Sequence, residues 1–178
     1  MNILLWCTIK KWAGKLFGFQ REIDELRRRV VELSWDYSFG MWTRQAFLEF
    51  CRVMPRGLRT IAFIDLNDIH TLNYHYSYIE VDRRIHTTFS IPFRRSDIVA
   101  RWYSGDEIVI LFDSDRTGAE WKISELREAA RRSGLTFVCA LGEWEVGRQP
   151  IEEIIATLSQ HTVQEKLVNS PTTLLEPA

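Results

Sequence analysis

The chain has 178 residues, of which 46% are hydrophobic and 12% aromatic, and its formal net charge is -1. This length can bury one sizeable core, so we expect one domain with a short appendage. The near-zero net charge provides no general attraction for nucleic acid, and we expect no nucleic-acid partner. The cysteines, Cys7, Cys51 and Cys139, are widely spaced without a CxxC pair, which argues against a disulfide framework and a structural zinc site. This cysteine pattern fits a reducing cytoplasm.

The N-terminal segment begins with apolar residues, but Lys10, Lys11 and Lys15 interrupt it before the roughly 20 residues that a membrane span requires. The apolar part precedes the positive charges, whereas a signal peptide has the opposite order. Aromatic residues alternate with these lysines, so an amphipathic segment lying on an anionic membrane surface is one interpretation. We expect a cytoplasmic protein, with peripheral contact at the inner face of the membrane as an open alternative.

A heptad pattern follows this segment. Its apolar residues recur at spacings of three and four, at Leu16, Phe19, Ile23, Leu26, Val30 and Leu33. The pattern predicts a short coiled-coil stalk. Two arrangements satisfy it: a parallel homodimer, or a helix packed against its own domain.

Beyond the stalk, hydrophobic periodicity and Gly/Pro punctuation predict alternating helices and strands. They comprise a helix over 43–54, a strand over 60–66, a helix over 75–89, a hairpin over 97–112, a helix over 118–132, a strand over 135–141 and a helix over 150–168. Strands and helices therefore mix in one α+β unit. We divide the chain into an N-terminal amphipathic or coiled-coil helix (1–35), a domain (36–170) and a flexible tail (171–178).

Three carboxylates stand at the ends of predicted strands. The run over 60–66 is almost wholly apolar, as expected for a strand buried on both faces, and Asp65 lies near its end. The turn of the hairpin would present Asp106 and Glu107 side by side. Carboxylates brought together in this way hold two Mg²⁺ ions in palm-type nucleotidyl transferases. Alternatively, Asp65 caps the next helix and Ser104-Gly105-Asp106 is only a tight turn.

Four motifs, in the right order, resemble those of the GGDEF domain, the diguanylate cyclase family. The first motif, Asp-x-Leu-Thr-Gly-Leu-x-Asn-Arg-Arg-x-Phe, is matched over 36–47, and the Asp-Leu-Asp-x-Phe-Lys-x-Ile-Asn-Asp run over 65–74. The later Gly-Asp pair is Val81-Asp82, and the signature is Ser104-Gly105-Asp106-Glu107-Ile108. The resemblance implies a palm-like α+β fold, with a central, mostly antiparallel sheet flanked by helices and preceded by a helical stalk.

The resemblance also implies an activity. Two GTP molecules, one per chain, would be condensed across an antiparallel homodimer into cyclic di-GMP, with Mg²⁺ or Mn²⁺ as cofactor. Asp65 and Asp106 would be metal ligands, assisted by the carbonyl oxygen of Leu66. Glu107 would be the second signature acid at the metal and the reacting hydroxyl.

The nucleotide itself would be held by further residues that match the family motifs. An amide and a carboxylate can read the amide and amino groups of guanine, and glycine lets the backbone approach a ligand closely. Lys166, in the position of the family's C-terminal lysine, would touch the triphosphate, and His70 stands where the family has another lysine. These candidate nucleotide-binding residues are Asn73, Asp82, Ser104, Gly105, Lys166 and His70.

Arg94 and Asp97 match the Arg-x-x-Asp inhibitory site of the family, where the product cyclic di-GMP binds. A guanidinium beside a carboxylate can grip phosphate and guanine together. The alternative is an exposed, weak salt bridge at the start of a strand.

Departures from the family pattern concern mainly the phosphate contacts. His70 replaces a lysine, Tyr74 an aspartate and Ser170 an arginine, so we expect weaker triphosphate binding. One extra residue lies between Arg101 and Ser104, for which we expect a bulge in the hairpin.

Three functions therefore remain open. The first is an active diguanylate cyclase. The second is a degenerate domain that binds GTP or cyclic di-GMP as a receptor or interaction module. The third is a palm-type cyclase that makes another cyclic or linear nucleotide.

Overall fold

The computed structural model describes residues 20–23, 25–26, 29–30, 33–103 and 105–169. The chain divides into two compact units, Met1–Trp35 and Asp36–Ala178. The segment predicted to lie on a membrane surface and the predicted tail over 171–178 fall outside the described residues. Within those residues, no helix is long and apolar enough to cross a membrane.

In the first unit, the described residues from 20 to 34 are helical. Four of the predicted seam residues belong to this part, and their side chains are exposed: Ile23, Leu26, Val30 and Leu33. The pairing of these side chains with a second copy of the chain stays a prediction.

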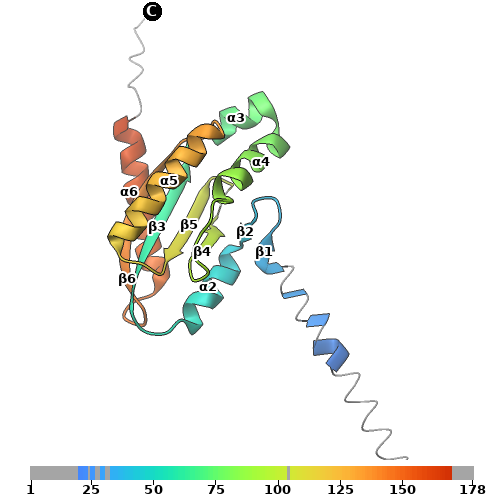
Figure 1. The fold of residues 1–178 in the computed structure, drawn as a ribbon, viewed down its shortest axis with the longest axis vertical. Helices are drawn as coiled ribbons and strands as arrows, with labels where there is room; N and C mark the ends of the chain where they lie inside the picture. Colours follow the sequence, from blue (N-terminus) through green and yellow to red (C-terminus); the bar gives the residue numbers. More distant parts are fainter. Residues whose placement is uncertain (1–19, 24, 27–28, 31–32, 104, 170–178) are drawn as a thin grey trace, which may run out of the picture. The chain divides into compact units, whose positions relative to one another are not determined.

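The described part of the second unit is built on one sheet with the strand order β1-β2-β4-β5-β3-β6 (Figure 1). The strands are β1 (Trp35–Asp36), β2 (Met41–Trp42), β3 (Leu58–Leu66), β4 (Ile98–Arg101), β5 (Glu107–Phe112) and β6 (Phe137–Glu145). β3 pairs antiparallel with both β5 and β6, and β4 pairs antiparallel with β5, whereas β2 and β4 are parallel. The mostly antiparallel sheet is confirmed.

Helices cover both faces of this sheet. They are α2 (Arg44–Val53), α3 (Ile69–Tyr76), α4 (Tyr78–Phe89), α5 (Arg116–Arg132) and α6 (Ile151–Asn169). Ala62 and Ile64 of β3 pack in a cluster with α4 and α5, whereas Ile61 and Phe63 pack in a second cluster with α2 and α6. Because alternate residues of a strand point to opposite faces, β3 is buried on both sides, as its apolar sequence predicts.

The local structure differs from expectation at two places: one helix was missed, and the predicted bulge in the hairpin is wrong. The helix expected over 75–89 is present as α4 (Tyr78–Phe89), but a further helix that was not predicted, α3 (Ile69–Tyr76), precedes it and meets it at Ser77 with φ 79°. A positive φ at a residue other than glycine leaves little mark on a sequence, and α3 has no fully buried residue that would reveal its period. The β4–β5 ladder runs without a bulge to the pair Arg101↔Ile108, and Trp102 N–H donates to Glu107 O at 2.8 Å. The predicted bulge is therefore absent from the described ladder.

We expect Gly40→Ala to lower the free energy of unfolding by about 1–2 kcal/mol, the cost of a left-handed conformation for an L-residue. Gly40 has φ +65°, and an added Cβ would lie 2.5 Å from Cδ2 and Nε2 of His86. The His86 ring is exposed and can move away, so the backbone is the main cause. Urea denaturation should therefore show that His86→Ala recovers little of the loss in the double variant. Full recovery would instead assign the cost to the ring.

Candidate functional site

The ends of β3 and β5 bring the predicted acids together. Asp65 and Glu107 are direct partners across the antiparallel β3–β5 pair. The N–H of Leu66 donates to the backbone carbonyl of Asp106 at 2.9 Å, so the turn that carries Asp106 is held against the end of β3. Asp65 lies within β3, and the N-cap of α3 is Asp68, so the interpretation of Asp65 as a helix cap is wrong.

Lys166 of α6 joins this cluster. Its Nζ donates to Asp65 Oδ1 at 2.6 Å and to the carbonyl oxygen of Leu66 at 3.0 Å. Burial raises the pKa of Asp65, the Lys166 ammonium lowers it, and the charge of Asp106 raises it again. Asp65 is therefore a desolvated carboxylate with a second carboxylate nearby, a combination that favours a bound cation.

The donor set of this cluster fits a hard divalent cation. Asp65 Oδ1 and Leu66 O converge on a single positive group, and carboxylate and carbonyl oxygens are the ligands that Mg²⁺ prefers. The described residues contain no group of three or more His, Cys, Asp or Glu side chains placed to hold a metal ion. A metal at this position would therefore need the main-chain oxygen, and water or nucleotide oxygens, to complete its shell.

The two predicted guanine-reading residues lie on consecutive helices. Asn73 is on α3, and its Oδ1 is buried without a hydrogen-bond partner. A buried acceptor without a donor costs about 1–3 kcal/mol, so this atom is suited to receive a ligand N–H. Asp82 is half-buried on α4, and burial raises its pKa, while Arg101 lowers it and Asp36 raises it. His70, by contrast, is exposed on α3.

Arg101 links the start of the domain to the signature turn. Its Nη1 donates to Asp36 Oδ2 at 2.8 Å, and its guanidinium lies 4.4 Å from the centre of the Phe39 ring. A Cβ added at Gly105 would meet Arg101 Nη2 at 3.6 Å and Phe39 Cζ at 3.8 Å, which are ordinary contacts. The fold therefore has room for a small side chain at Gly105. Ser104, the neighbouring candidate, lies outside the described residues.

Arg44, which lies in the motif over 36–47 but was not a predicted site residue, supports the same turn. The Arg44 guanidinium lies 4.7 Å from the ring centre of Trp102 and 4.2 Å from that of Tyr103. Tyr103 directly precedes the signature and is exposed. The cation packed on both rings holds the first residues of the turn. An Arg followed by two aromatic residues 58 positions later carries no local pattern that would reveal this contact.

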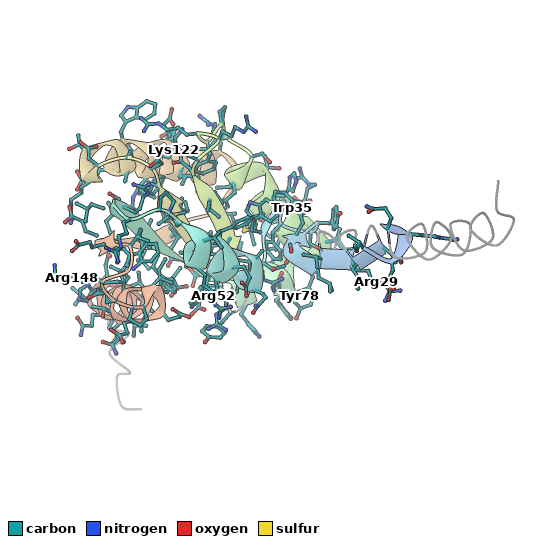
Figure 2. All side chains as sticks on the ribbon, turned by 90° about the horizontal axis from the view of Figure 1, so that it is seen from below. Arg29, Trp35, Arg52, Tyr78, Lys122 and Arg148 are labelled. Carbon is teal, nitrogen blue, oxygen red and sulfur yellow. The ribbon has the colours of Figure 1, made fainter. Side chains whose placement is uncertain are left out.

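Arg94 and Asp97 line a pocket of about 230 Å³ together with Trp121 and Lys122 of α5. Asp97 accepts hydrogen bonds from two backbone N–H groups, those of Arg94 and Asp113, both at 3.0 Å. The Arg94 side chain donates to the Asp113 carbonyl at 3.3 Å. Lys122, labelled in Figure 2, donates to Glu125 at 2.6 Å. Asp97 therefore stabilises the turn through its own hydrogen bonds, whether or not it also contacts a ligand.

We expect Asp97→Ala and Arg94→Ala to differ in stability. Asp97→Ala leaves two backbone donors without their acceptor and should lower the free energy of unfolding by about 1–2 kcal/mol. Arg94→Ala removes one exposed contact and should change it by less than about 0.5 kcal/mol. Thermal denaturation of both variants checks this difference. Equal losses would show that the Asp97 hydrogen bonds do not hold the turn.

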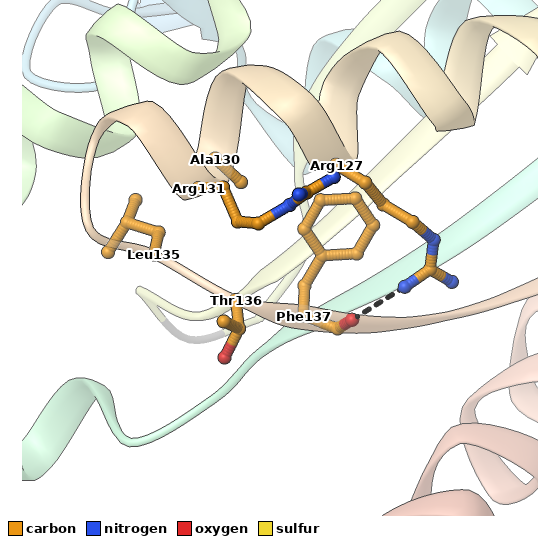
Figure 3. Close-up of a pocket in the computed structure, with 6 residues that line it drawn as sticks. All are labelled: Arg127, Ala130, Arg131, Leu135, Thr136 and Phe137. Carbon is orange, nitrogen blue, oxygen red and sulfur yellow. Dashed lines mark hydrogen bonds between the residues drawn. The ribbon is translucent and has the colours of Figure 1, made fainter.

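A second pocket of about 180 Å³ lies between α5 and the start of β6 (Figure 3). Arg127 lines it and donates to the Phe137 carbonyl at 3.1 Å. Thr136 on its rim accepts from Asn67 Nδ2 at 3.0 Å, which ties the segment after β3 to β6. None of the predicted site residues lines this pocket.

No protein-family model and no curated protein matches the sequence. Solved structures do match. The chain resembles the coiled coil and GGDEF domain of DgcB from Caulobacter crescentus, solved in complex with c-di-GMP, with TM-score 0.70, 14% identity, and coverage of 93% of this chain and 95% of that chain. It resembles the diguanylate cyclase SiaD from Pseudomonas aeruginosa, solved with its activator SiaC, with TM-score 0.65, 18% identity, and coverage of 93% and 70%.

A third similar structure is the GGDEF domain of FimX from Pseudomonas aeruginosa, with TM-score 0.62, 16% identity, and coverage of 74% of this chain and 92% of that chain. At such identities, structural similarity establishes the fold. The fold implied by the four sequence motifs is confirmed: the chain carries a domain with the GGDEF fold.

Proposed function

We propose that this protein is a diguanylate cyclase that converts two GTP into one cyclic di-GMP and two pyrophosphates. The observation that carries the proposal is the cluster at the ends of β3 and β5, where Asp65 pairs with Glu107 and Leu66 is bonded to Asp106. A simple turn has no need of three carboxylates beside a buried strand end. A nucleotidyl transfer does, because negative charge must be neutralised where a triphosphate meets a hydroxyl.

In this reaction, the 3′-oxygen of each GTP attacks the α-phosphorus of the other, and the bond to the leaving pyrophosphate breaks. Mg²⁺ or Mn²⁺, held by Asp65, Asp106 and the Leu66 carbonyl, would supply charge neutralisation at the triphosphate. Glu107 would accept the proton of the attacking hydroxyl. Lys166 would add positive charge for the triphosphate.

Guanine recognition would fall to Asn73 and Asp82. The buried Oδ1 of Asn73 supports this role, because it is an acceptor that still requires a donor. Guanine offers donors in its N1–H and 2-amino groups, whereas the corresponding edge of adenine offers an acceptor at N1. Backbone atoms at Gly105 would lie along the nucleotide, and His70 would stand near its phosphates in place of a lysine.

Each chain would bind one GTP, so product formation requires a homodimer. The exposed apolar residues Ile23, Leu26, Val30 and Leu33 support dimerisation through the stalk. Such a stalk would raise the effective concentration of the two catalytic domains. We also propose a cytoplasmic location, with peripheral contact of the N-terminal segment at the inner face of the membrane.

A receptor for cyclic di-GMP is the second candidate function. The pocket beside Arg94 and Asp97, and the exposed position of His70 in place of a phosphate-binding lysine, favour it. In this case Arg94 would bind the phosphates of cyclic di-GMP. Arg94→Ala, rather than Asp97→Ala, is the appropriate probe, because the Arg94 side chain contributes less to the turn.

The deciding experiment is to incubate the full chain with all four nucleoside triphosphates and Mg²⁺ or Mn²⁺ and to identify the products by mass spectrometry. Cyclic di-GMP as the product supports the cyclase. A different cyclic or linear nucleotide would select a palm-type cyclase of other specificity. No product, together with cyclic di-GMP binding that Arg94→Ala abolishes in calorimetry, would select the receptor.

A further inference from the structure

Lys166 contacts the two oxygen atoms that the cyclase proposal assigns to a metal ion. Its Nζ is 2.6 Å from Asp65 Oδ1 and 3.0 Å from Leu66 O. These atoms are 101 and 100 residues away in sequence, so only the docking of α6 beside the end of β3 brings the ammonium there. Lys166 therefore bonds both atoms at once.

We propose that Lys166 is a built-in cation that occupies the metal position in the nucleotide-free protein, and that a divalent ion must displace it. The inference rests on the proposed function only for the assignment of Asp65 and Leu66 as metal ligands. Mg²⁺ binds oxygen at about 2.0–2.1 Å, closer than a hydrogen-bonded ammonium, and two cations sharing the same oxygens would repel each other. The two occupants therefore exclude one another.

The electrostatics around Asp65 favour a cation beside its carboxylate both before and after a metal ion binds. Asp65 is partly buried, with Asp106 nearby, and both conditions penalise its charged form. The ammonium offsets this penalty before a metal arrives. Lysine suits the task, because its charge sits on a flexible four-carbon stem that can withdraw without moving the helix.

Displacement would also couple metal binding to nucleotide binding. Once the metal neutralises Asp65, the ammonium is released and can approach the triphosphate. The metal would therefore strengthen GTP binding, and GTP would strengthen metal binding to the same extent. Lys166 acts here as a positioning residue whose two locations correspond to the empty and the loaded site.

The first test measures Mn²⁺ affinity of the full chain by electron paramagnetic resonance of the free ion, without nucleotide. Lys166→Met removes the competing cation and should bind Mn²⁺ about 5- to 150-fold more tightly than the parent, the usual range for coupled sites. Lys166→Arg keeps a cation and should stay close to the parent. Lys122→Met is the matched control, because Lys122 is also partly buried and ion-paired, with Glu125, but lies on α5.

Unchanged or weaker Mn²⁺ binding by Lys166→Met would overturn the inference. Asp65→Asn separates this outcome from a failure of the proposed function. If the parent binds Mn²⁺ and Asp65→Asn does not, the metal site stands even where Lys166 proves not to compete. If no variant binds Mn²⁺, both the metal site and the inference fail.

A second test measures the parent chain itself and needs a variant only to assign one signal. The hydrogen-bonded ammonium of Lys166 should exchange slowly and give an observable ¹⁵Nζ signal by nuclear magnetic resonance, assigned with Lys166→Arg. Saturating Mg²⁺ should shift or abolish this signal and leave that of Lys122 unchanged. A Lys166 signal that persists unaltered at saturating Mg²⁺ would overturn displacement.

Discussion

Replacing Asp106 with asparagine is expected to reduce the rate of cyclic di-GMP formation at saturating GTP and Mg²⁺ by about 10³-fold or more. Asparagine has nearly the same shape but no charge. The variant should therefore fold as the parent does but bind the metal ion more weakly. The loss should appear in kcat, because the charge neutralised by the metal matters most in the transition state.

Glu145→Gln is the matched control for this experiment. It also removes one carboxylate charge, but Glu145 pairs with Leu58, at the opposite end of β3 from Asp65. Thermal denaturation of both variants should show melting temperatures close to that of the parent. An Asp106→Asn variant that retains most of its activity would remove the carboxylate cluster from the mechanism and with it the main support for a cyclase.

The sequence was sufficient to predict β3 and the acids at its end, for identifiable reasons. A strand buried on both faces must be apolar throughout, so the charge of Asp65 marks the strand's end. The Ser-Gly-Asp turn marks the hairpin that brings Asp106 and Glu107 to the same edge, and the β3–β5 register then places Glu107 opposite Asp65. Both elements can be predicted from neighbouring residues alone, without reference to contacts between distant parts of the chain.

What the sequence did not reveal depends on such distant contacts or on unusual backbone. Lys166 could be assigned to a triphosphate by analogy, but its bond to Asp65 follows only from the docking of α6. The break at Ser77 requires a positive φ that serine rarely adopts. Arg44 packs on Trp102 and Tyr103 because α2 lies close to β4, a contact with no local pattern.

The break at Ser77 also shapes the proposed base-recognition site. It separates α3 from α4, so Asn73 and Asp82 stand on two helices rather than along one. The backbone carbonyl of Asn73 accepts from the N–H of Ser77 at 3.2 Å, which fixes the end of α3. Asn73 therefore lies in the last turn of α3, near a change of chain direction.

We expect Asn73→Ala and Asp82→Asn each to lower the ratio of kcat/KM for GTP to that for ATP by about 10²-fold. A buried acceptor rejects adenine because it would be left without a donor, and removing the acceptor removes that penalty. The reaction rates with GTP, ATP and inosine triphosphate, which lacks the 2-amino group, provide the measurement. The variant that no longer distinguishes GTP from inosine triphosphate identifies the side chain that bonds this amino group.

Tyr74→Phe is the control for base selectivity, because Tyr74 adjoins Asn73 on α3 but its side chain is exposed. Selectivity in the parent should also fall in acid. The carboxylate of Asp82 must be ionised to accept from guanine, and burial raises its pKa above the ordinary value for aspartate, so it is protonated at a higher pH than an exposed aspartate. The preference for GTP over ATP should therefore fall on acidification in the parent but not in Asp82→Asn, whereas protonation of Asp65 at the metal would weaken both nucleotides alike. An unchanged preference for GTP in both site variants would mean that these two side chains do not read the base.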